Sequence, residues 1–501
     1  MIIIVLYYQF GRATVPVIAS EVSHSAEKAA DDHLYRQIAR SIERQVNKDV
    51  YTPGERVPSV RRLSAQLKVS VGTVLEAYRL LEDEGVLEVR PQSGYYARLR
   101  KARAPAEPEM SRPPRAPTAV SNLEFASHIL ESIRRPDLVQ LGVSAPHTSF
   151  LPTRQINRIA GAILRRDDGS VHRYDYPPGL PALRRQIARR MLDAGCDLSP
   201  DEIVITGGCR EAVTLCLRAV ARPGDVIAVE SPTYYGTLQA IEALGMKALE
   251  IPTHPQEGIS LEALEFAIER HDVKACALLL NFSNPVGACM SDQNKQKLVR
   301  LLAQHEIPLI EDDIFGDLAY AKARPKVAKA FDRKGLVLSC SSFSKTISPG
   351  FRIGWAVPGR FQLRVEHLKY VSTIAAPSLQ EMAIAEFLSH GRYERHLRAT
   401  RMSFQQNAKR MNNAIARHFP EDTRVSRPAG GFLSWIQLSP GVDALELHRL
   451  ALAAGISVAP GPLFSAKRKY QDFIRLTYAI PWDERVEQAL HTLGRLTKSM
   501  A

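Results

Sequence analysis

The sequence predicts a multidomain protein: a small helical domain that ends in a β-hairpin, followed by a larger α/β domain with a mainly parallel central sheet. Three observations support this fold class. The chain has 501 residues, which is more than one ordinary domain holds. Residues 99–121 are rich in proline and charge, which is typical of a linker. The hydrophobic pattern differs on its two sides, so we expect domains at residues 32–98 and 122–501.

The composition excludes several classes of protein. Hydrophobic residues make up 45% and charged residues 24% of the chain, so a mostly disordered, collagen-like or coiled-coil protein is not expected. Lys and Arg total 66 against 53 Asp and Glu, and the formal charge of +13 permits binding of nucleic acids or anionic ligands. The six cysteines include no CxxC pair, so we expect reduced thiols in a cytoplasmic protein and no metal site.

The N-terminal segment MIIIVLYYQFGR is apolar but lacks the basic region that begins a signal peptide. Its apolar run is only about eight residues, whereas a membrane-spanning helix needs ~20. No other stretch is long enough, so no membrane partner is expected. We expect residues 1–31 to form a disordered extension.

Three helices are predicted in the small domain. The first has an apolar stripe that consists of Leu34, Ile38, Ile42 and Val46. Ser59 and Ser70 each precede a run with helical periodicity, so we expect them to cap the second and third helices. The third helix buries one apolar face and ends before Gly85.

Two short strands follow, at residues 86–90 and 95–98. A helix, a helix-turn-helix and a β-hairpin together make a winged helix-turn-helix, which places the start of its third helix in the major groove of DNA. Side chains there, on the second helix and at the wing can contact phosphates or base edges. The residues expected at this interface are Arg61, Arg62, Ser70, Thr73, Arg90, Ser93 and Gly94.

This module resembles the DNA-binding domain of GntR-family transcription regulators. The resemblance rests on PGERVPSVRRL at residues 53–63 and TVLEAYRLLEDEG at residues 73–85. It implies a double-stranded DNA operator as partner; the alternative is a small helical domain used for protein contact. Many family members carry Arg directly after the Ser that opens the recognition helix, but this chain has Val71 and then Gly72. The base specificity of those family members is therefore not assigned to this chain.

In the large domain, short apolar runs alternate with amphipathic helices. Such strands indicate a largely parallel sheet that is buried on both faces. The runs lie at residues 203–205, 226–230, 275–280, 307–312 and 336–340.

Residues with distinct chemical uses follow several of these strands. Lys345 comes shortly after one strand, where desolvation would lower the pKa of its amine and suit it to Schiff-base formation. Asp312 ends another strand, and its carboxylate can hold a pyridinium N–H. Asn284 can donate to a phenolate oxygen, and Tyr234 can stack on a ring.

A glycine turn at residues 206–211 joins a strand to a helix and contains Gly208, Cys209 and Arg210. Such a turn offers backbone N–H groups and a helix dipole to a phosphate. Arg352 follows Lys345 by seven residues and can supply a guanidinium for the same phosphate.

With these residues in this order, the segment from about 137 to 501 resembles class I/II aminotransferases of fold type I, which use pyridoxal 5′-phosphate (PLP). The resemblance implies that Lys345 forms the Schiff base with PLP and that Asp312 pairs with its pyridine nitrogen. Asn284 contacts the ring oxygen and Tyr234 stacks on the ring. The residues that surround the phosphate are Gly208, Cys209, Arg210, Ser342 and Arg352.

The resemblance also implies two residues outside this group, and it has one departure. Tyr174 matches a tyrosine that reaches the phosphate of the partner subunit, although Tyr176 is close by. Arg475 matches the arginine that binds a substrate α-carboxylate. Phe315 stands where family members often have a tyrosine that hydrogen-bonds the ring oxygen, and this weakens the expectation of efficient turnover.

A GntR-type winged helix, a Pro-rich linker and an aminotransferase-like domain in one chain resemble the MocR regulators. We therefore expect a PLP-dependent transcription regulator that senses an amino acid, an amine or PLP, and a homodimer. One alternative is a working aminotransferase with a secondary DNA-binding domain. Another is a DNA-binding scaffold whose large domain is inactive. The effector, the operator sequence and the direction of regulation are not predicted.

Overall fold

The computed structural model describes residues 34–47, 50–51, 54–83, 86–90, 93–98, 104–112, 116–121, 135–166 and 168–501. The chain divides into two compact units, residues 1–103 and 104–501. The extension predicted at residues 1–31 lies outside the described residues. Among the helices of the described part, none is long and apolar enough to cross a membrane.

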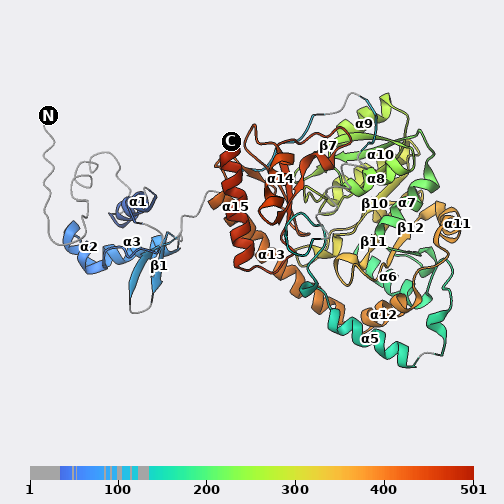
Figure 1. Ribbon diagram of the computed structural model, residues 1–501, viewed down its shortest axis with the longest axis horizontal. Coiled ribbons are helices and arrows are strands. Elements are labelled where there is room, and N and C mark those ends of the chain that lie inside the picture. The colour runs from blue at the N-terminus through green and yellow to red at the C-terminus, as the bar shows by residue number, and fades with distance from the viewer. Residues whose placement is uncertain are drawn as a thin grey trace. The chain divides into compact units, whose positions relative to one another are not determined.

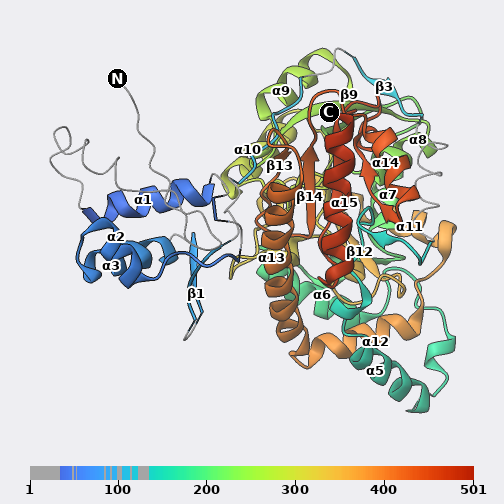
Figure 2. The same ribbon diagram turned by 60° about the vertical axis from the view of Figure 1, so that its left-hand side comes forward.

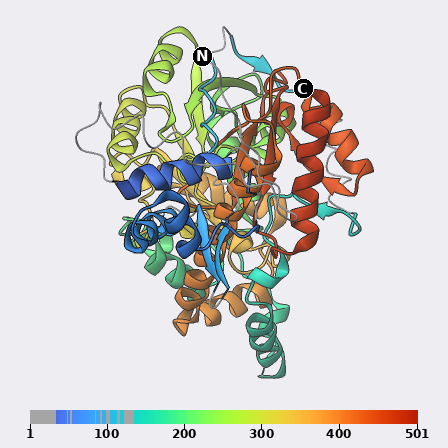
Figure 3. The same ribbon diagram turned by 90° about the vertical axis from the view of Figure 1, so that its left-hand side faces the viewer.

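The first unit has three helices and a hairpin. These are α1 (Leu34–Asn47), α2 (Val60–Leu67), α3 (Val71–Asp83), β1 (Leu87–Arg90) and β2 (Gly94–Ala97). The hairpin projects from the helices (Figures 1, 2 and 3). Its strands are antiparallel, with Arg90 opposite Gly94. The predicted winged helix-turn-helix is therefore present.

Hydroxyl caps and one buried core fix these helices. Ser59 Oγ accepts a hydrogen bond from Arg62 N at 3.3 Å, and Ser70 Oγ accepts one from Thr73 N at 3.0 Å. Such caps satisfy N–H groups that have no partner within the helix. The core joins all three helices to the hairpin, and its buried members include Ile38, Ile42, Leu63, Val74, Tyr78, Leu81 and Leu87.

A large central sheet organises the second unit. Its strands are β3 (Thr118–Ala119), β5 (Val204–Thr206), β6 (Val226–Ser231), β7 (Lys247–His254), β8 (Gly258–Ile259), β9 (Val273–Leu278), β10 (Leu309–Asp312), β11 (Val337–Ser342) and β12 (Gly354–Val357). The order is β3-β7-β6-β9-β10-β11-β12-β5, and β8 pairs with β7. Strands β6, β7, β9, β10 and β11 are parallel, whereas β12 is antiparallel to both neighbours. The sheet is therefore mixed and mostly parallel, as predicted.

Helices cover both faces of this sheet. They are α7 (Cys209–Val220), α8 (Tyr235–Ala243), α9 (Leu261–Arg270), α10 (Asp292–Gln304) and α11 (Gln362–Thr373). Alternate strand residues point to opposite faces. Ile227 and Val229 pack in the cluster with α7, α8 and α11, while Ala228 packs with α9 and α10. This two-sided burial explains why the strands are continuously apolar.

A smaller antiparallel sheet lies in the C-terminal part, with the strand order β13-β14-β17-β16. Its strands are β13 (Arg424–Val425), β14 (Leu433–Gln437), β16 (Ala459–Pro460) and β17 (Phe473–Thr477); β15 (Ile456–Ser457) pairs instead with β4 (Val139–Gln140). The remaining helices are α5 (Thr153–Arg166), α6 (Pro181–Asp193), α12 (Ser378–Ser389), α13 (Arg392–His418), α14 (Ala444–Ala453) and α15 (Glu484–Met500). Helices α13 and α15 lie side by side (Figures 1 and 2).

The Pro-rich segment belongs largely to the second unit. Ala106 O accepts a hydrogen bond from Val425 N at 2.8 Å, and Glu109 pairs with Arg424 at 2.7 Å. Further along, β3 pairs with the edge strand β7. The prolines keep this segment extended, and its carbonyl and carboxylate oxygens find donors on the second unit. The described residues 104–112 and 116–121 thus form a packed strap, which composition alone does not reveal.

Candidate functional site

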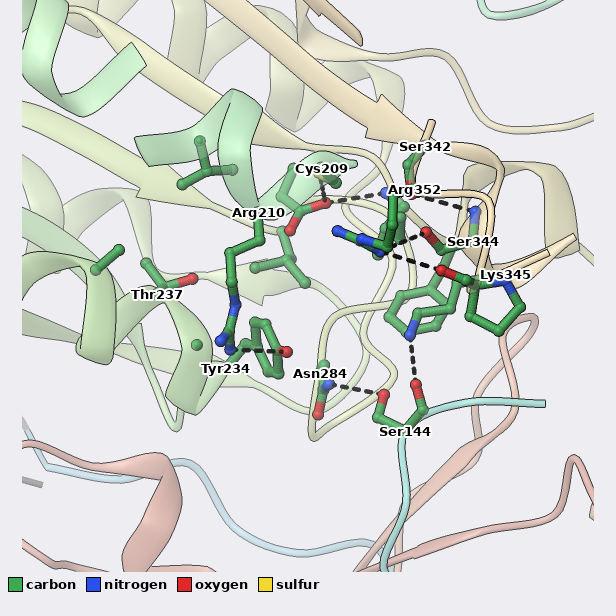
Figure 4. Close-up of a pocket in the computed structure, with 18 residues that line it drawn as sticks. Ser144, Cys209, Arg210, Tyr234, Thr237, Asn284, Ser342, Ser344, Lys345 and Arg352 are labelled. Atoms are coloured by element: carbon green, nitrogen blue, oxygen red, sulfur yellow. Dashed lines mark hydrogen bonds between the residues drawn. The ribbon is translucent and has the colours of Figure 1, made fainter. Parts of the chain in front are cut away.

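A cavity of about 310 Å³ lies at the carboxyl ends of β10 and β11 (Figure 4). In parallel α/β sheets this edge is where ligands bind, because strand ends and helix starts meet there. The cavity is lined by Ser144, Cys209, Arg210, Val213, Tyr234, Gly236, Thr237, Ala240, Leu279, Asn284, Asp312, Ile314, Phe315, Ser342, Ser344, Lys345, Pro349 and Arg352. The predicted cofactor residues are therefore brought together, except Gly208, which adjoins the lining, and Tyr174.

Lys345 stands in the short 3-10 turn Phe343–Lys345, directly after β11. Its Nζ donates a hydrogen bond to the backbone oxygen of Ser144 (Figure 4). Burial, helped by the charge of Arg475, lowers the pKa of this amine to about 8. A sizeable fraction of the amine is therefore neutral near pH 8, which is the form that attacks a carbonyl.

Asp312 is the last residue of β10. Its Oδ1 accepts hydrogen bonds from Ile314 N and from the Cys209 thiol, both at 3.1 Å. Burial raises the pKa of Asp312 to about 6, against the lowering effect of these two hydrogen bonds. The carboxyl is still mostly ionised at neutral pH, so it can accept a charged N–H.

A cationic turn lies at the start of α7. Arg352 Nη2 donates to Gly207 O at 2.7 Å, and Nη1 donates to Ser344 Oγ at 3.4 Å. Gly208 has a φ of +97°, and a Cβ there would clash with Arg352 Nη2, so only glycine fits. The free N–H groups of the helix start and the guanidinium favour an anion. Arg352 itself has a φ of +54°, a left-handed conformation that is uncommon for non-glycine residues.

Arg210 lies on the other side of the cavity, next to Tyr234 (Figure 4). Its Nη2 is 3.4 Å from the Tyr234 hydroxyl and 3.3 Å from Gln239 Oε1. Burial raises the pKa of Tyr234 to about 12, so its phenol stays protonated. The guanidinium of Arg210 thus faces the tyrosine in this structure, while Arg352 faces the glycine turn.

Arg475, on β17, is fully buried and lies beside the cavity. It donates to Asn284 Oδ1 at 3.2 Å and to Gly142 O, and its guanidinium lies 5.2 Å from the Phe464 ring centre. Its Nε has no hydrogen-bond partner among the described residues. A buried guanidinium with an uncommitted N–H is suited to a carboxylate.

Two further predicted features have clear positions. Phe315 lines the cavity and packs edge-on against Phe432 with ring centres 5.3 Å apart, so no hydroxyl is present at this position. Tyr174 is 65% exposed, with Tyr176 5.7 Å away between ring centres. The structure does not bring Tyr174 to the cavity of its own chain.

Several cavity residues come from distant segments of the chain and were not predicted from the sequence. Ser144 Oγ accepts a hydrogen bond from Asn284 Nδ2 at 3.3 Å, and its carbonyl accepts from Lys345. Thr237 lines the cavity from α8. No spacing or periodicity marks these residues. Ser344 could have been found, because it lies within the same short segment as Lys345.

In the first unit, the predicted DNA-binding residues lie on α2, at the start of α3 and on the wing. Arg61 and Arg62 are exposed. Arg90 pairs with Glu88 at 2.8 Å, and its guanidinium lies 4.3 Å from the Tyr96 ring centre. Ser93 Oγ is hydrogen-bonded to Tyr96 Oη. The remaining predicted residues are Ser70, Thr73 and Gly94.

Comparison with known families assigns both units. The family of aminotransferase class I and II matches residues 136–493, and the family of bacterial regulatory proteins of the gntR type matches residues 34–96. The crystal structure of LysN, an α-aminoadipate aminotransferase of Thermus thermophilus complexed with N-(5′-phosphopyridoxyl)-L-leucine, superposes with a TM-score of 0.69. The two sequences are 27% identical, and the match covers 75% of this chain and 97% of the LysN chain. The fold and site define a DNA-binding protein built on a fold type I aminotransferase.

Full-length relatives share this arrangement. YjiR and YdcR of Escherichia coli strain K12, both named uncharacterized HTH-type transcriptional regulators, are each 39% identical to this chain. The match covers 92% of this chain and 98% of each relative. The chain belongs to the MocR-like family of transcriptional regulators, in which a gntR-type DNA-binding domain is fused to a class I and II aminotransferase domain.

Proposed function

We propose that the protein is a PLP-dependent transcription regulator. It binds a double-stranded DNA operator through its winged helix-turn-helix and senses an amino acid, an amine or PLP in the cavity of its second unit. The observation that carries the proposal is the Lys345 amine beside Asp312 and Arg352, in one cavity of a chain that also has a gntR-type domain.

The residues present fit PLP. The cavity of about 310 Å³ is of the size that small ligands need. Arg352 and the start of α7 would hold the phosphate, and Asp312 would hold the pyridine nitrogen. When bound, PLP supplies an aldehyde that captures amines and a ring that accepts electrons. The neutral form of Lys345 is available to hold that aldehyde.

We assign the other cavity residues as follows. Gly208, Cys209 and Ser342 would surround the phosphate from the turn and from the end of β11. Asn284 would contact the ring oxygen, and Tyr234 would cover the ring. Arg210 adds a cation that can turn from Tyr234 toward the phosphate, because its two contacts are long and shared with Gln239.

Arg475 points to an α-amino acid as effector. Its guanidinium is buried, and its Nε has no partner among the described residues. Burial lowers its pKa, since desolvation disfavours the charged form. A carboxylate that binds beside Arg475 would therefore stabilise the charged guanidinium, because it supplies an opposite charge. Amines without a carboxylate would gain nothing from Arg475 and should bind less tightly.

The Pro-rich strap offers a route from the cavity to the DNA-binding unit. Ser111 Oγ donates to Ser231 O at 3.4 Å, and Ser231 Oγ lies 2.8 Å from Tyr470 Oη. Ser231 precedes Tyr234 by three residues, so a ligand that displaces Tyr234 would act close to the contact between the strap and the second unit. Ligand binding would then change the strength of the contacts between the strap and the second unit. The range of motion of the DNA-binding unit would change with it.

An exposed aromatic surface supports a homodimer. Tyr176 and Tyr370 have ring centres 6.1 Å apart, and both side chains are more than half exposed. The same surface includes Tyr174, Val371 and Ile374, which are also exposed. An apolar patch of this kind indicates a protein interface. In a dimer, Tyr174 would reach the cavity of the partner subunit.

Selection of bound DNA from a random pool, with and without PLP and a panel of amino acids, tests the proposal. A selected sequence whose binding responds to PLP or to an amino acid is expected. Lys345→Ala should remove the response to the ligands and retain DNA binding, whereas the exposed control Lys409→Ala should behave as the wild type. Selection of no sequence would refute the regulator.

One observation favours a second function, that of a working aminotransferase. Lys345, Asp312 and Arg475, which hold the reacting groups in the proposal, are all placed in or beside one cavity. Repeated conversion of an amino acid to its oxo acid, faster than any change in DNA binding, would favour the enzyme. Conversion limited to a single round would favour the regulator.

A further inference from the structure

The start of α3 presents an apolar side chain to solvent. Val71, the first residue of the helix, is 51% exposed, while Val74, Ala77, Tyr78 and Leu81 of the same helix are fully buried. The core therefore uses the other face of α3 and does not need Val71. Among the described residues of the unit, Val71 is not part of the hydrophobic core.

Nothing among the described residues of the unit requires a glycine at position 72. It lies in the helix without a positive φ, and a Cβ built on it would meet only Ser70 Oγ at 3.6 Å. Gly94 of the wing, by contrast, has a φ of +113°. Glycine weakens a helix relative to alanine, so its presence indicates that something outside the unit approaches the backbone closely.

The hydroxyls beside these residues are already engaged. Ser70 Oγ and Thr73 Oγ1 are 2.7 Å apart, and Ser70 Oγ also accepts from Thr73 N. Val71 and Gly72 lie between these two residues in the sequence. They present the methyl groups of valine and a position without a side chain, and neither carries a charge. The start of α3 is therefore unsuited to guanine, whose major-groove edge has two acceptors and is read by Arg or Lys.

We propose that Val71 and Gly72 read thymine in the operator through its C5 methyl group. That methyl is the one apolar group that a base pair presents in the major groove. The Val71 side chain would pack against it, and Gly72 would let the helix come close enough. This inference rests on the proposed DNA-binding function, and it adds which base the start of α3 selects.

Replacement of thymine by deoxyuridine, one position at a time, tests the inference with the full-length protein. Deoxyuridine lacks only the methyl group. With the operator obtained by selection, the wild type should lose about threefold to fivefold in affinity at one or two positions, since burial of one methyl group has that worth. Val71→Ala should show a smaller difference between thymine and deoxyuridine, because alanine has less apolar surface to place against the methyl group, while the control Val50→Ala, also exposed in this unit, should retain the wild-type difference.

Gly72→Ala provides a second measurement that a purely structural role would not explain. The variant should melt at a temperature a few degrees higher than the wild type, because alanine favours the helix, and yet bind the operator more weakly. Equal affinity of wild type and Gly72→Ala, or of thymine and deoxyuridine operators at every position, would overturn the inference while leaving the regulator intact. Failure to select any sequence would instead refute the proposed function.

Discussion

Gly208→Ala is expected to remove the proposed phosphate site without unfolding the protein. The new Cβ would clash with Arg352 Nη2 and lie 2.9 Å from its Cζ, so the guanidinium must move. The move breaks its hydrogen bond to Gly207 O, which is 2.7 Å long in the wild type. Because the Arg352 position depends on this contact, the cation leaves the place where the phosphate would lie.

Two effects contribute to the magnitude. The backbone conformation, with φ at +97° and ψ at 169°, costs about 1–3 kcal/mol for an alanine and lowers the stability of the fold. Loss of a charge-assisted hydrogen bond is worth about 1.5–3 kcal/mol, and it acts on the site. We therefore expect the affinity for PLP to fall by roughly 10-fold to 100-fold, which corresponds to ~1.4–2.8 kcal/mol.

Gly224→Ala separates the two effects. Gly224 has a φ of +92°, and no atom lies within 4 Å of a Cβ built on it. This variant should lose a similar amount of stability and keep the wild-type affinity for PLP. The assay is an absorbance titration with PLP, together with thermal unfolding of both variants. Wild-type affinity in Gly208→Ala, or the same loss in both variants, would refute the reasoning.

Three other predictions follow from the described contacts. Lys345 has its pKa lowered to about 8, so the rate at which the protein captures PLP should rise with pH and level off above about pH 8; a rate independent of pH between 6 and 9, measured by stopped-flow absorbance, would contradict this. Burial raises the pKa of Glu381 to about 7 from its usual 4.5, so the folded state binds the proton more tightly and stability should fall, by about 3 kcal/mol, as pH rises from about 4.5 through 7. Glu381→Gln should remove that decline in thermal unfolding, and an unchanged decline would show that other groups cause it. Ser111→Ala should reduce the ligand-induced change in operator affinity by about twofold to tenfold and leave PLP binding unchanged, as the loss of one hydrogen bond predicts, with Thr118→Ala on the same strap as control.

The chemistry at the strand ends was predictable because it depends on local pattern and one topological rule. Lys345 and Asp312 each follow a continuously apolar run, and parallel strands put their carboxyl ends on one edge of the sheet. The order β10-β11 then places the two residues in one cavity. The recognition helix was predictable for the same reason, because the Ser70 cap and the apolar face are local signals.

Other parts of the site depend on contacts that no local pattern encodes. Ser144 reaches Lys345 across 201 positions of the chain. Arg210 follows the glycine turn in sequence, but its guanidinium contacts Tyr234 and Gln239 and faces away from the turn. Composition marks the Pro-rich segment as a linker, whereas its contact with Val425 depends on an edge that only the folded second unit provides.

The free energy of the polar contacts between the strap and the second unit is of the size that the proposed regulation requires. To change operator occupancy from about 10% to 90%, a ligand must favour one state about 80-fold, or ~2.6 kcal/mol. The polar contacts of the strap with the second unit include those of Ala106, Glu109 and Ser111. If each is worth about 0.5–1.5 kcal/mol when broken, the loss of two or three supplies the required difference. In the proposed regulator, one contact would be too weak and a strap without contacts would transmit nothing, so the packing of the Pro-rich segment would make ligand control of the DNA-binding unit energetically feasible.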